Sequence, residues 1–188
     1  MPILPAEPDM YPADLWSVAS GGHGSGRHWW CLHTKPRQEK SAARHLRNRG
    51  LAHYLPQIRR DDRTPKGRKT SSVLPLFSSY LFLLGDDNDR LEAYRGNNLV
   101  NILEVKDQGQ LEHDLRQIHQ LLSSGLPILP EPELPIGSRV RILSGPLVGM
   151  EGTIVRWGNR DHFIAVVEFL GRGAKVELQS WQVEPIKP

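Results

Sequence analysis

The sequence predicts an α+β protein of two domains, in which a mixed N-terminal domain precedes a small all-β C-terminal domain. Residues 74–84, LPLFSSYLFLL, form an apolar run with turn residues at both ends, which is typical of a buried central strand. Residues 126–137, LPILPEPELPIG, hold four prolines and are predicted to be an extended linker. Beyond the linker, short strand patterns follow one another at tight spacing, which favours a small barrel.

The charge of the chain is unevenly distributed. The formal net charge of the 188 residues is only +3, but residues 27–84 carry 13 Lys/Arg against 3 Asp/Glu, a local net charge of +10. A basic block beside an acidic remainder predicts that one surface of the N-terminal domain faces a polyanion.

The single cysteine, Cys31, excludes an internal disulfide and favours a reducing compartment, for which we expect the cytoplasm. No apolar run approaches the roughly 20 residues that cross a bilayer. The N-terminus lacks the basic start and apolar segment of a signal peptide. We therefore expect no membrane contact.

Residues 1–26 are rich in proline and end in SGGHGSG, a composition that cannot bury a core. We predict that this segment is a disordered extension. The N-terminal domain is then expected at 27–125, the linker at 126–137 and the C-terminal domain at 138–188.

The N-terminal domain begins with a predicted strand at 28–33, HWWCLH. A helix follows, with Thr34 as its expected cap and Gly50 as its end. The expected buried stripe of this helix consists of Ala42, Ala43 and Leu46. Its outer face carries a basic ridge at spacings i, i+3, i+7 and i+10, formed by Arg37, Lys40, Arg44 and Arg47.

Such a ridge is commonly only a solvated helix face. Here Glu39 alone offsets its charge, which favours a role in binding phosphate and places Arg37, Lys40 and Arg44 among the candidate nucleic-acid-binding residues. The remaining elements predicted for this domain are a strand at 51–58, a long mobile loop at 59–72, the central strand, a helix at 86–94, a strand at 99–105 and a helix at 111–122.

The central strand has two apolar faces. Tyr80 and Phe82 share one face and Leu81 and Leu83 share the other, because side chains alternate along a strand. If the leucines face the core, the aromatic pair lies on a second surface. Periodicity alone favours covering of that surface by helices of the same domain over a groove for a partner.

The C-terminal domain is predicted to contain strands at 139–143, 152–157, 162–169, 174–179 and from 181. Gly152 falls where backbone passes close in a tight barrel. Such an SH3-like barrel does not by itself indicate a function.

In this order, the segments resemble the NusG/RfaH family of transcription elongation factors over residues 28–187. The matching pieces are HWWCLHTKPRQEKSAARHL, PLFSSYLFL, GSRVRILSGPLVGMEGTIV, which resembles a KOW motif, and FLGRGAKVELQSWQVE. The resemblance implies an NGN domain, an antiparallel sheet flanked by helices, that binds the clamp helices of RNA polymerase. By position, the binding pocket would use His33, Tyr80 and Phe82. The chain departs from the family in having Ser78-Ser79 before the tyrosine.

The resemblance implies two further surfaces. Specialised family members contact the non-template DNA strand at positions that match Lys35, His45 and Arg95. In the KOW domain, the loop that meets the ribosomal protein NusE or the termination factor Rho matches Phe169, Leu170, Gly171 and Arg172, with Leu170 as its exposed anchor. We expect a β-barrel there and not a helical hairpin, because residues 139–184 show little helical periodicity.

The most concordant interpretation is a monomeric elongation factor of the bacterial nucleoid that suppresses pausing and termination, with a specialised antiterminator favoured over a housekeeping factor. A KOW-type RNA-binding or ribosome-associated protein is the alternative of another class. Catalysis, a cofactor and a metal are not expected, since His28 faces away from Cys31 and His33 on a strand. No nucleophile motif or phosphate-binding loop is found.

Overall fold

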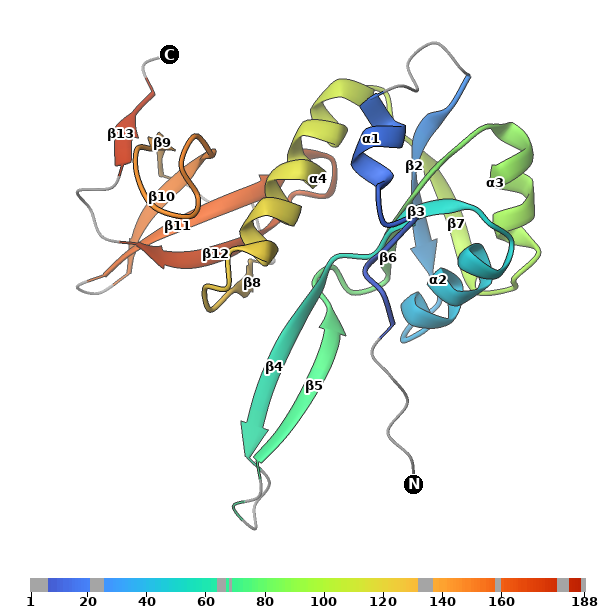
Figure 1. The fold of residues 1–188 in the computed structure, drawn as a ribbon, viewed down its shortest axis with the longest axis horizontal. Coiled ribbons are helices and arrows are strands. Elements are labelled where there is room, and N and C mark those ends of the chain that lie inside the picture. The colour runs from blue at the N-terminus through green and yellow to red at the C-terminus, as the bar shows by residue number, and fades with distance from the viewer. Residues whose placement is uncertain are drawn as a thin grey trace. The chain divides into compact units, whose positions relative to one another are not determined.

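The computed structural model describes residues 7–20, 26–63, 67, 69–131, 137–157, 160–178 and 183–186 (Figure 1). The chain forms two compact units, residues 1–108 and 109–188. Each unit has its own antiparallel sheet, which confirms the predicted fold class. No helix in the described ranges is long and apolar enough to span a membrane.

The first unit is built on a five-stranded sheet with the order β1-β3-β6-β2-β7. Its elements are β1 (Met10–Tyr11), α1 (Leu15–Ser20), β2 (His28–Thr34), α2 (Glu39–Asn48), β3 (Ala52–Tyr54), β4 (Gln57–Arg63), β5 (Lys69–Pro75), β6 (Tyr80–Gly85), α3 (Asp87–Tyr94) and β7 (Leu99–Glu104). All its strand pairs are antiparallel, and β6, the predicted central strand, lies in the middle.

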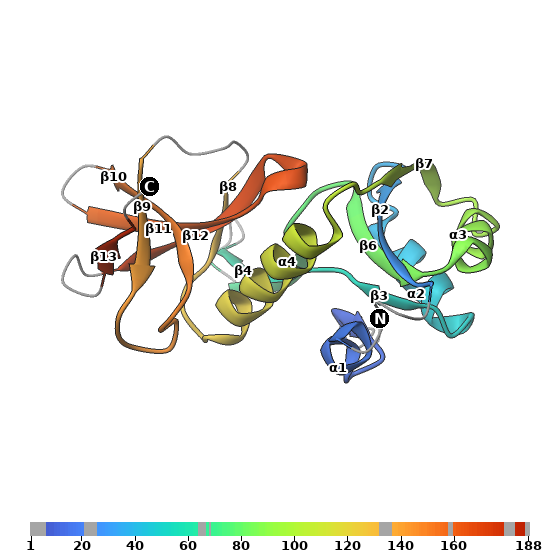
Figure 2. The same cartoon turned by 90° about the horizontal axis from the view of Figure 1, so that it is seen from above.

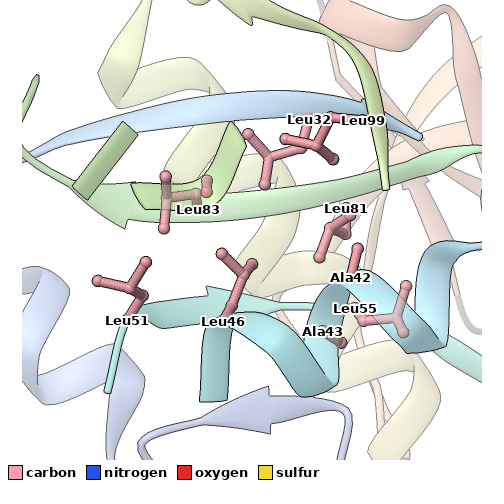
Figure 3. Close-up of a cluster of buried hydrophobic side chains, with 10 residues drawn as sticks. Leu32, Ala42, Ala43, Leu46, Leu51, Leu55, Leu81, Leu83 and Leu99 are labelled. Atoms are coloured by element: carbon pink, nitrogen blue, oxygen red, sulfur yellow. The ribbon is translucent and has the colours of Figure 1, made fainter. Parts of the chain in front are cut away.

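One face of this sheet packs against α2. Leu81 and Leu83 of β6 point at Leu46, and at Ala42 and Ala43 of the same helix, as Figure 3 shows. These residues are the stripe predicted for the helix and the core face predicted for the strand. Burial of these apolar side chains, each worth about 1.5–3 kcal/mol for a leucine, fixes the helix on the sheet.

The opposite face carries Trp29, Cys31 and Phe82, which are all buried. Burial raises the pKa of the Cys31 thiol to about 12. Helix α1 covers part of this face, with Leu15 fully buried and with the Trp16 ring 6.1 Å from the Trp29 ring (Figure 1). On this part of the face, a helix of the same unit covers the sheet, as periodicity alone favoured, and among the described residues no groove for a partner is left there.

The prediction of a disordered N-terminal extension is wrong for the segment that carries β1 and α1. Strand β1 pairs with β3, with Met10 opposite Tyr54 and Tyr11 opposite His53. The Trp16 ring also lies edge-on to Tyr54, with 5.2 Å between ring centroids. Residues 1–6 and 21–25 lie outside the described residues.

The predicted mobile loop at 59–72 is also wrong, because most of its described residues lie in the paired strands β4 and β5. Arg59 pairs with Val73 and Arg60 with Ser72. The hairpin extends away from the five-stranded sheet (Figure 1). Residues 64–66 and 68 lie outside the described residues.

The second unit contains all but the first residue of α4 and a six-stranded, strongly curved sheet with the order β13-β9-β10-β11-β12-β8 (Figure 2). Its elements are α4 (Gln108–Ser123), β8 (Leu129–Glu131), β9 (Ser138–Ile142), β10 (Glu151–Trp157), β11 (Arg160–Val167), the 3-10 helix η2 (Glu168–Leu170), β12 (Arg172–Leu178) and β13 (Val183–Pro185). The predicted β structure of this region is confirmed, and residues 179–182 lie outside the described part.

The proline-rich segment at 126–137 is not entirely irregular. Strand β8 within it pairs with β12, with Leu129 opposite Lys175 and Pro130 opposite Ala174. Strand β8 is an edge strand of the sheet, where the missing N–H of a proline is tolerated. The chain divides between Gln108 and Gly109, so the boundary of the two compact units falls at the start of α4 instead of within the linker. Residues 132–136 lie outside the described residues.

Candidate functional site

His33 and Tyr80 lie side by side where β2 and β6 pair. Their rings are stacked, with 5.0 Å between centroids and 17° between planes. Both side chains are half-buried, so the pair rests on the sheet and still reaches the surface. An aromatic pair held in this way offers apolar contact area at little entropic cost.

A buried carboxylate fixes the turn that leads into Tyr80. Glu39, in the first turn of α2, accepts a hydrogen bond from the Ser79 N–H through Oε1 at 2.7 Å. The Thr34 N–H in turn donates to the Ser79 carbonyl at 2.9 Å. Ser79 has a φ of 69°, which a residue other than glycine adopts only with support. The structural role of Glu39 was not predicted, although it belongs to the KPRQE segment that carries the family resemblance.

Thr34 does not cap α2, contrary to the prediction from the sequence. It is the last residue of β2, and its side chain is buried. The helix begins at Glu39, after a turn in which Arg37 has a φ of 60°. The proline at position 36 therefore lies in the turn before the helix.

Phe82 does not reach the surface with Tyr80. It is fully buried, pairs in register between Cys31 and Tyr54, and lies edge-on to Phe77 at 6.3 Å between ring centroids. The period-2 rule places Tyr80 and Phe82 on the same face correctly, but neighbouring side chains cover one end of that face. Phe82 thus supports the surface from below and cannot contact a partner in this conformation.

Lys35 lies against the loop between α3 and β7. Its Nζ donates to Asn97 Oδ1 at 3.0 Å, and its backbone N–H donates to the Asn98 carbonyl at 2.9 Å. Ser41 Oγ of α2 donates to Asn98 Oδ1 at 3.2 Å. These contacts bring the start of α2 and the loop after α3 into one polar surface.

His45 and Arg95 complete this polar surface. His45 Nε2 lies 3.1 Å from the Glu92 carbonyl oxygen, and its ring occupies the space beside Gly96, where an added Cβ would come within 2.7 Å of the ring. Arg95 is exposed and forms an ion pair with Glu92. The structure therefore gathers Lys35, His45 and Arg95, the three positions that the resemblance connects with DNA.

The predicted basic ridge of α2 is not one continuous face. Arg37 precedes the helix and is exposed, whereas the Lys40 Nζ donates to the carbonyl of Val73 in β5. Arg44 and Arg47 both form ion pairs with Glu7. The helical period was correct for residues 39–48, but the partners supplied by distant segments were not predictable from spacing.

In the second unit, η2 and Gly171 form the turn between β11 and β12. Gly171 adopts a φ of 62°, a left-handed conformation that suits glycine. Phe169 is the exposed apolar side chain of this turn, at 39% exposure, whereas Leu170 is half-buried. The expectation that Leu170 is the exposed anchor is therefore wrong. Arg172 begins β12 and is half-buried.

Helix α4 holds the start of this turn. Asp114 Oδ2 accepts a hydrogen bond from the Glu168 N–H at 2.9 Å, and its Oδ1 accepts one from Gln110 Nε2 at 2.8 Å. Gln117 Oε1 accepts the Glu151 N–H at 2.9 Å. A polar cavity of about 110 Å³ lies among these side chains. Polar contacts therefore fix α4 on the sheet of the second unit.

Asp114 should make the stability of the second unit depend on pH. Burial raises the pKa of its carboxyl above the usual value of 3.8, and the hydrogen bonds from Glu168 and Gln110 oppose this only in part. Since the folded pKa exceeds the unfolded one, ionised Asp114 costs stability at neutral pH, and this cost disappears as pH falls through the raised pKa towards 3.8. Wild type should therefore gain stability relative to Asp114→Asn between neutral pH and about pH 4.

Urea unfolding of the full chain at several pH values, with the second unit followed by NMR, measures this difference. Glu151→Gln is a control of opposite sign, because the hydrogen bond from Arg141 lowers the pKa of Glu151. Wild type should lose stability relative to that variant on acidification. A pH-independent difference between wild type and Asp114→Asn would contradict the assignment.

Residues 28, 31 and 33, considered as a metal or thiol site, do not act as one cluster. Within the part of the chain that the structure describes, no group of three or more His, Cys, Asp and Glu side chains could hold a metal ion. Cys31 is buried among apolar side chains, and burial keeps its thiol protonated.

Comparison with known proteins decides the family. The family model described as transcription termination factor nusG matches residues 27–122, just over half of the chain. The chain belongs to the NusG family. This NusG family member is thus assigned to a family of transcription elongation factors that generally bind RNA polymerase, and not to a family of enzymes.

No curated protein sequence matched this NusG family member. A solved structure of NusG from Thermotoga maritima, "Domain interaction in Thermotoga maritima NusG", is similar to it with 19% identity and a TM-score of 0.48. The similarity covers 86% of this chain and 98% of the T. maritima chain.

Proposed function

We propose that this NusG family member binds the clamp helices of RNA polymerase and suppresses pausing and termination, as a specialised antiterminator acting in the bacterial cytoplasm at the nucleoid. The observation that carries the proposal is the stacked pair of His33 and Tyr80. The pair is rigid, partly exposed and held by a buried hydrogen bond beneath the turn before Tyr80. Rigid aromatic anchors of this kind dominate the energy of protein interfaces.

Two neighbouring features support a protein partner at this place. Leu74 of β5 is an exposed apolar side chain that precedes the same turn. Phe77 of this turn is buried and lies edge-on to the buried ring of Phe82, which anchors the turn to the sheet. In the proposal, His33 and Tyr80 contact the clamp, and Phe82 maintains the shape of the surface.

The polar surface around residues 95–98 is proposed to contact the non-template DNA strand. Lys35 and Arg95 supply cations there, and His45 supplies a ring beside Gly96. Arg37 is exposed close to the start of α2 and adds a further positive charge. Cations in such a cluster bind phosphate without sequence preference, so the affinity should fall as salt rises.

Three features favour a specialised factor: the serines at 78 and 79, the segment that forms β1 and α1, and the basic hairpin. A housekeeping role, in which the second unit couples polymerase to Rho or to the ribosome through NusE, is favoured by the exposure of Phe169 in the turn formed with Gly171. Transcript profiling after deletion of the gene separates the two roles. A specialised factor should change a few long operons, whereas a housekeeping factor should change most transcripts.

Replacing both His33 and Tyr80 with alanine should reduce co-purification with RNA polymerase at least tenfold, because the aromatic contact area is lost. Phe169→Ala is the matched control, since it removes an exposed aromatic side chain from the second unit. Thermal unfolding of each variant verifies that the fold persists. Retention of polymerase by the double variant at the level of the control would refute the assignment of this surface.

A further inference from the structure

The two C-terminal arginines of α2 share one carboxylate. Arg44 Nε lies 3.5 Å from Glu7 Oε2, and Arg47 Nη2 forms an ion pair with Glu7 Oε1. Each carboxylate oxygen thus has its own guanidinium. Two arginines that converge on one oxyanion make a site that also suits the oxygens of a phosphate group.

The Glu7 carboxylate is held beside the two arginines by a backbone segment that is itself hydrogen-bonded to the domain. We name residues 7–20 the N-terminal arm. Gln57 Nε2 donates to the Glu7 carbonyl at 3.0 Å, and the Leu55 N–H donates to the Asp9 carbonyl at 2.6 Å. Further along the arm, Leu15 is fully buried. Because the arm is fixed at several points, Glu7 stays beside the arginines at a high effective concentration.

The arginines remain accessible although the carboxylate is not. The Arg44 and Arg47 side chains are 51% and 31% exposed, whereas the Glu7 side chain is only 10% exposed. Because both guanidinium groups are partly exposed, water and salt screen these ion pairs on the arginine side. A ligand with a stronger and more extended negative charge can therefore displace the Glu7 side chain while the arm backbone keeps its hydrogen bonds.

We propose that Arg44 and Arg47 form a phosphate site for the nucleic-acid backbone and that Glu7 occupies this site as a built-in competitor. The inference rests on the proposed contact of this domain with DNA and extends it. The polar surface around residues 95–98 is open to nucleic acid at all times, whereas the Arg44–Arg47 site opens only when phosphate replaces the carboxylate. Weak or transient DNA contacts are thereby disfavoured over extended ones.

The alternative is that Glu7 only fastens the arm to α2. The two roles differ in what happens when the charge of Glu7 is removed. A fastening role predicts a looser arm with unchanged DNA affinity. A competitor role predicts tighter DNA binding with the arm in place, because the Gln57 and Leu55 hydrogen bonds use the backbone of the arm and not the Glu7 side chain.

The test measures binding of the full chain to a fluorescent single-stranded DNA oligonucleotide by anisotropy over a salt series. Glu7→Gln should bind about threefold to tenfold more tightly than wild type at low salt, with a steeper salt dependence, because two cations are released for phosphate. Adding Arg44→Ala and Arg47→Ala to Glu7→Gln should abolish this gain.

Glu104→Gln is the matched control. Glu104 is an exposed acid on β7, the opposite edge strand of the same sheet, and its replacement changes the net charge by the same amount. This control should stay within about twofold of wild type, since distant surface charges are screened. Hydrogen exchange at the Leu55 amide, which the arm protects, reports whether the arm remains bound in each variant.

Equal affinities of Glu7→Gln and Glu104→Gln would overturn the inference, whatever the state of the arm. A gain that accompanies loss of protection at Leu55 would also overturn it, because the arm and not the carboxylate would then be the barrier. Failure of the underlying proposal looks different: no variant would show salt-dependent binding, and Lys35→Ala would have no effect. Salt-dependent binding that Lys35→Ala weakens and Glu7→Gln leaves unchanged refutes the competitor alone.

Discussion

Replacing Glu39 with alanine is expected to lower the free energy of unfolding of the first unit by about 3 kcal/mol and to weaken polymerase binding at least tenfold. The carboxylate accepts the Ser79 N–H at 2.7 Å in a buried site. Without it, that N–H loses its partner, and Ser79 keeps a left-handed conformation with less support. Because Tyr80 follows directly, the stacked aromatic pair should lose its fixed position.

Glu39→Gln is the appropriate control, since an amide keeps an acceptor oxygen of the same reach. It should cost about 1 kcal/mol or less. Urea unfolding followed by NMR signals of the first unit measures the stability of that unit, and co-purification measures binding. Equal stability of the alanine and glutamine variants would show that the Ser79 hydrogen bond contributes little.

Replacing Gly152 with alanine is expected to destabilise the second unit by about 3 kcal/mol or more. An added Cβ would collide with the backbone carbonyl oxygen of Ile164 on the adjacent strand and would lie 2.6 Å from Cζ of the Phe163 ring. A carbonyl within a paired strand cannot move without breaking the ladder. The close approach of backbone that the sequence predicted at this glycine is thus confirmed.

The comparison for this prediction is Gly149→Asn. Gly149 has a φ of +84° and no atom within 4 Å of an added Cβ, and asparagine tolerates the left-handed region better than most residues. Its cost should be about 1 kcal/mol or less. Two-dimensional NMR of the full chain would show loss of dispersed signals from the second unit in Gly152→Ala only. A folded second unit of wild-type stability in Gly152→Ala would contradict the expected collision.

The elements that the sequence predicted well are those whose signal is local. The apolar run around Leu81 identified the central strand, and the spacing of Ala42 and Leu46 identified the buried face of α2. Alternation and turn residues located the strands of the second unit. In each case the pattern of side chains reflects a core that the segment itself helps to form.

The N-terminal arm was missed because its stability is not local. Its proline-rich composition resembles that of a disordered segment, and α1 has only 6 residues. The stabilising partners, Trp29 and Tyr54, lie on two different strands outside the arm, β2 and β3. The arm carried one signal, the apolar pair Leu15 and Trp16, but nothing in the sequence indicated what that pair contacts.

The hairpin and β8 were missed for a different reason. The hairpin extends away from the sheet. The side chains described for β4 and β5 are half-buried or exposed and form no core, so they have no reason to alternate between apolar and polar. Strand β8 contains Pro130, which argues against a strand unless the strand lies at an edge, and edge position cannot be read from the sequence.

The candidate site was predictable in part. The resemblance placed His33 with Tyr80, and placed Lys35 with Arg95. The structure stacks His33 on Tyr80 and bonds Lys35 to Asn97, two residues after Arg95. The alternation of side chains along the strand predicted on which face Phe82 lies. It did not predict that neighbouring side chains bury Phe82 there. The spacing of the ridge gave the direction of Arg44 but not the carboxylate that meets it, because that carboxylate comes from the arm.

Because the single cysteine is buried, its reaction with thiol reagents reports on opening of the first unit. Alkylating and oxidising reagents react with the thiolate. Cys31 is fully buried in the sheet, and burial raises the pKa of its thiol to about 12, so the folded protein does not offer a thiolate to these reagents. A reagent can modify it only in molecules whose sheet has momentarily opened. The rate of thiol labelling at neutral pH therefore follows the opening of the first unit, and copies of the folded chain are protected from becoming cross-linked through sulfur under oxidative stress.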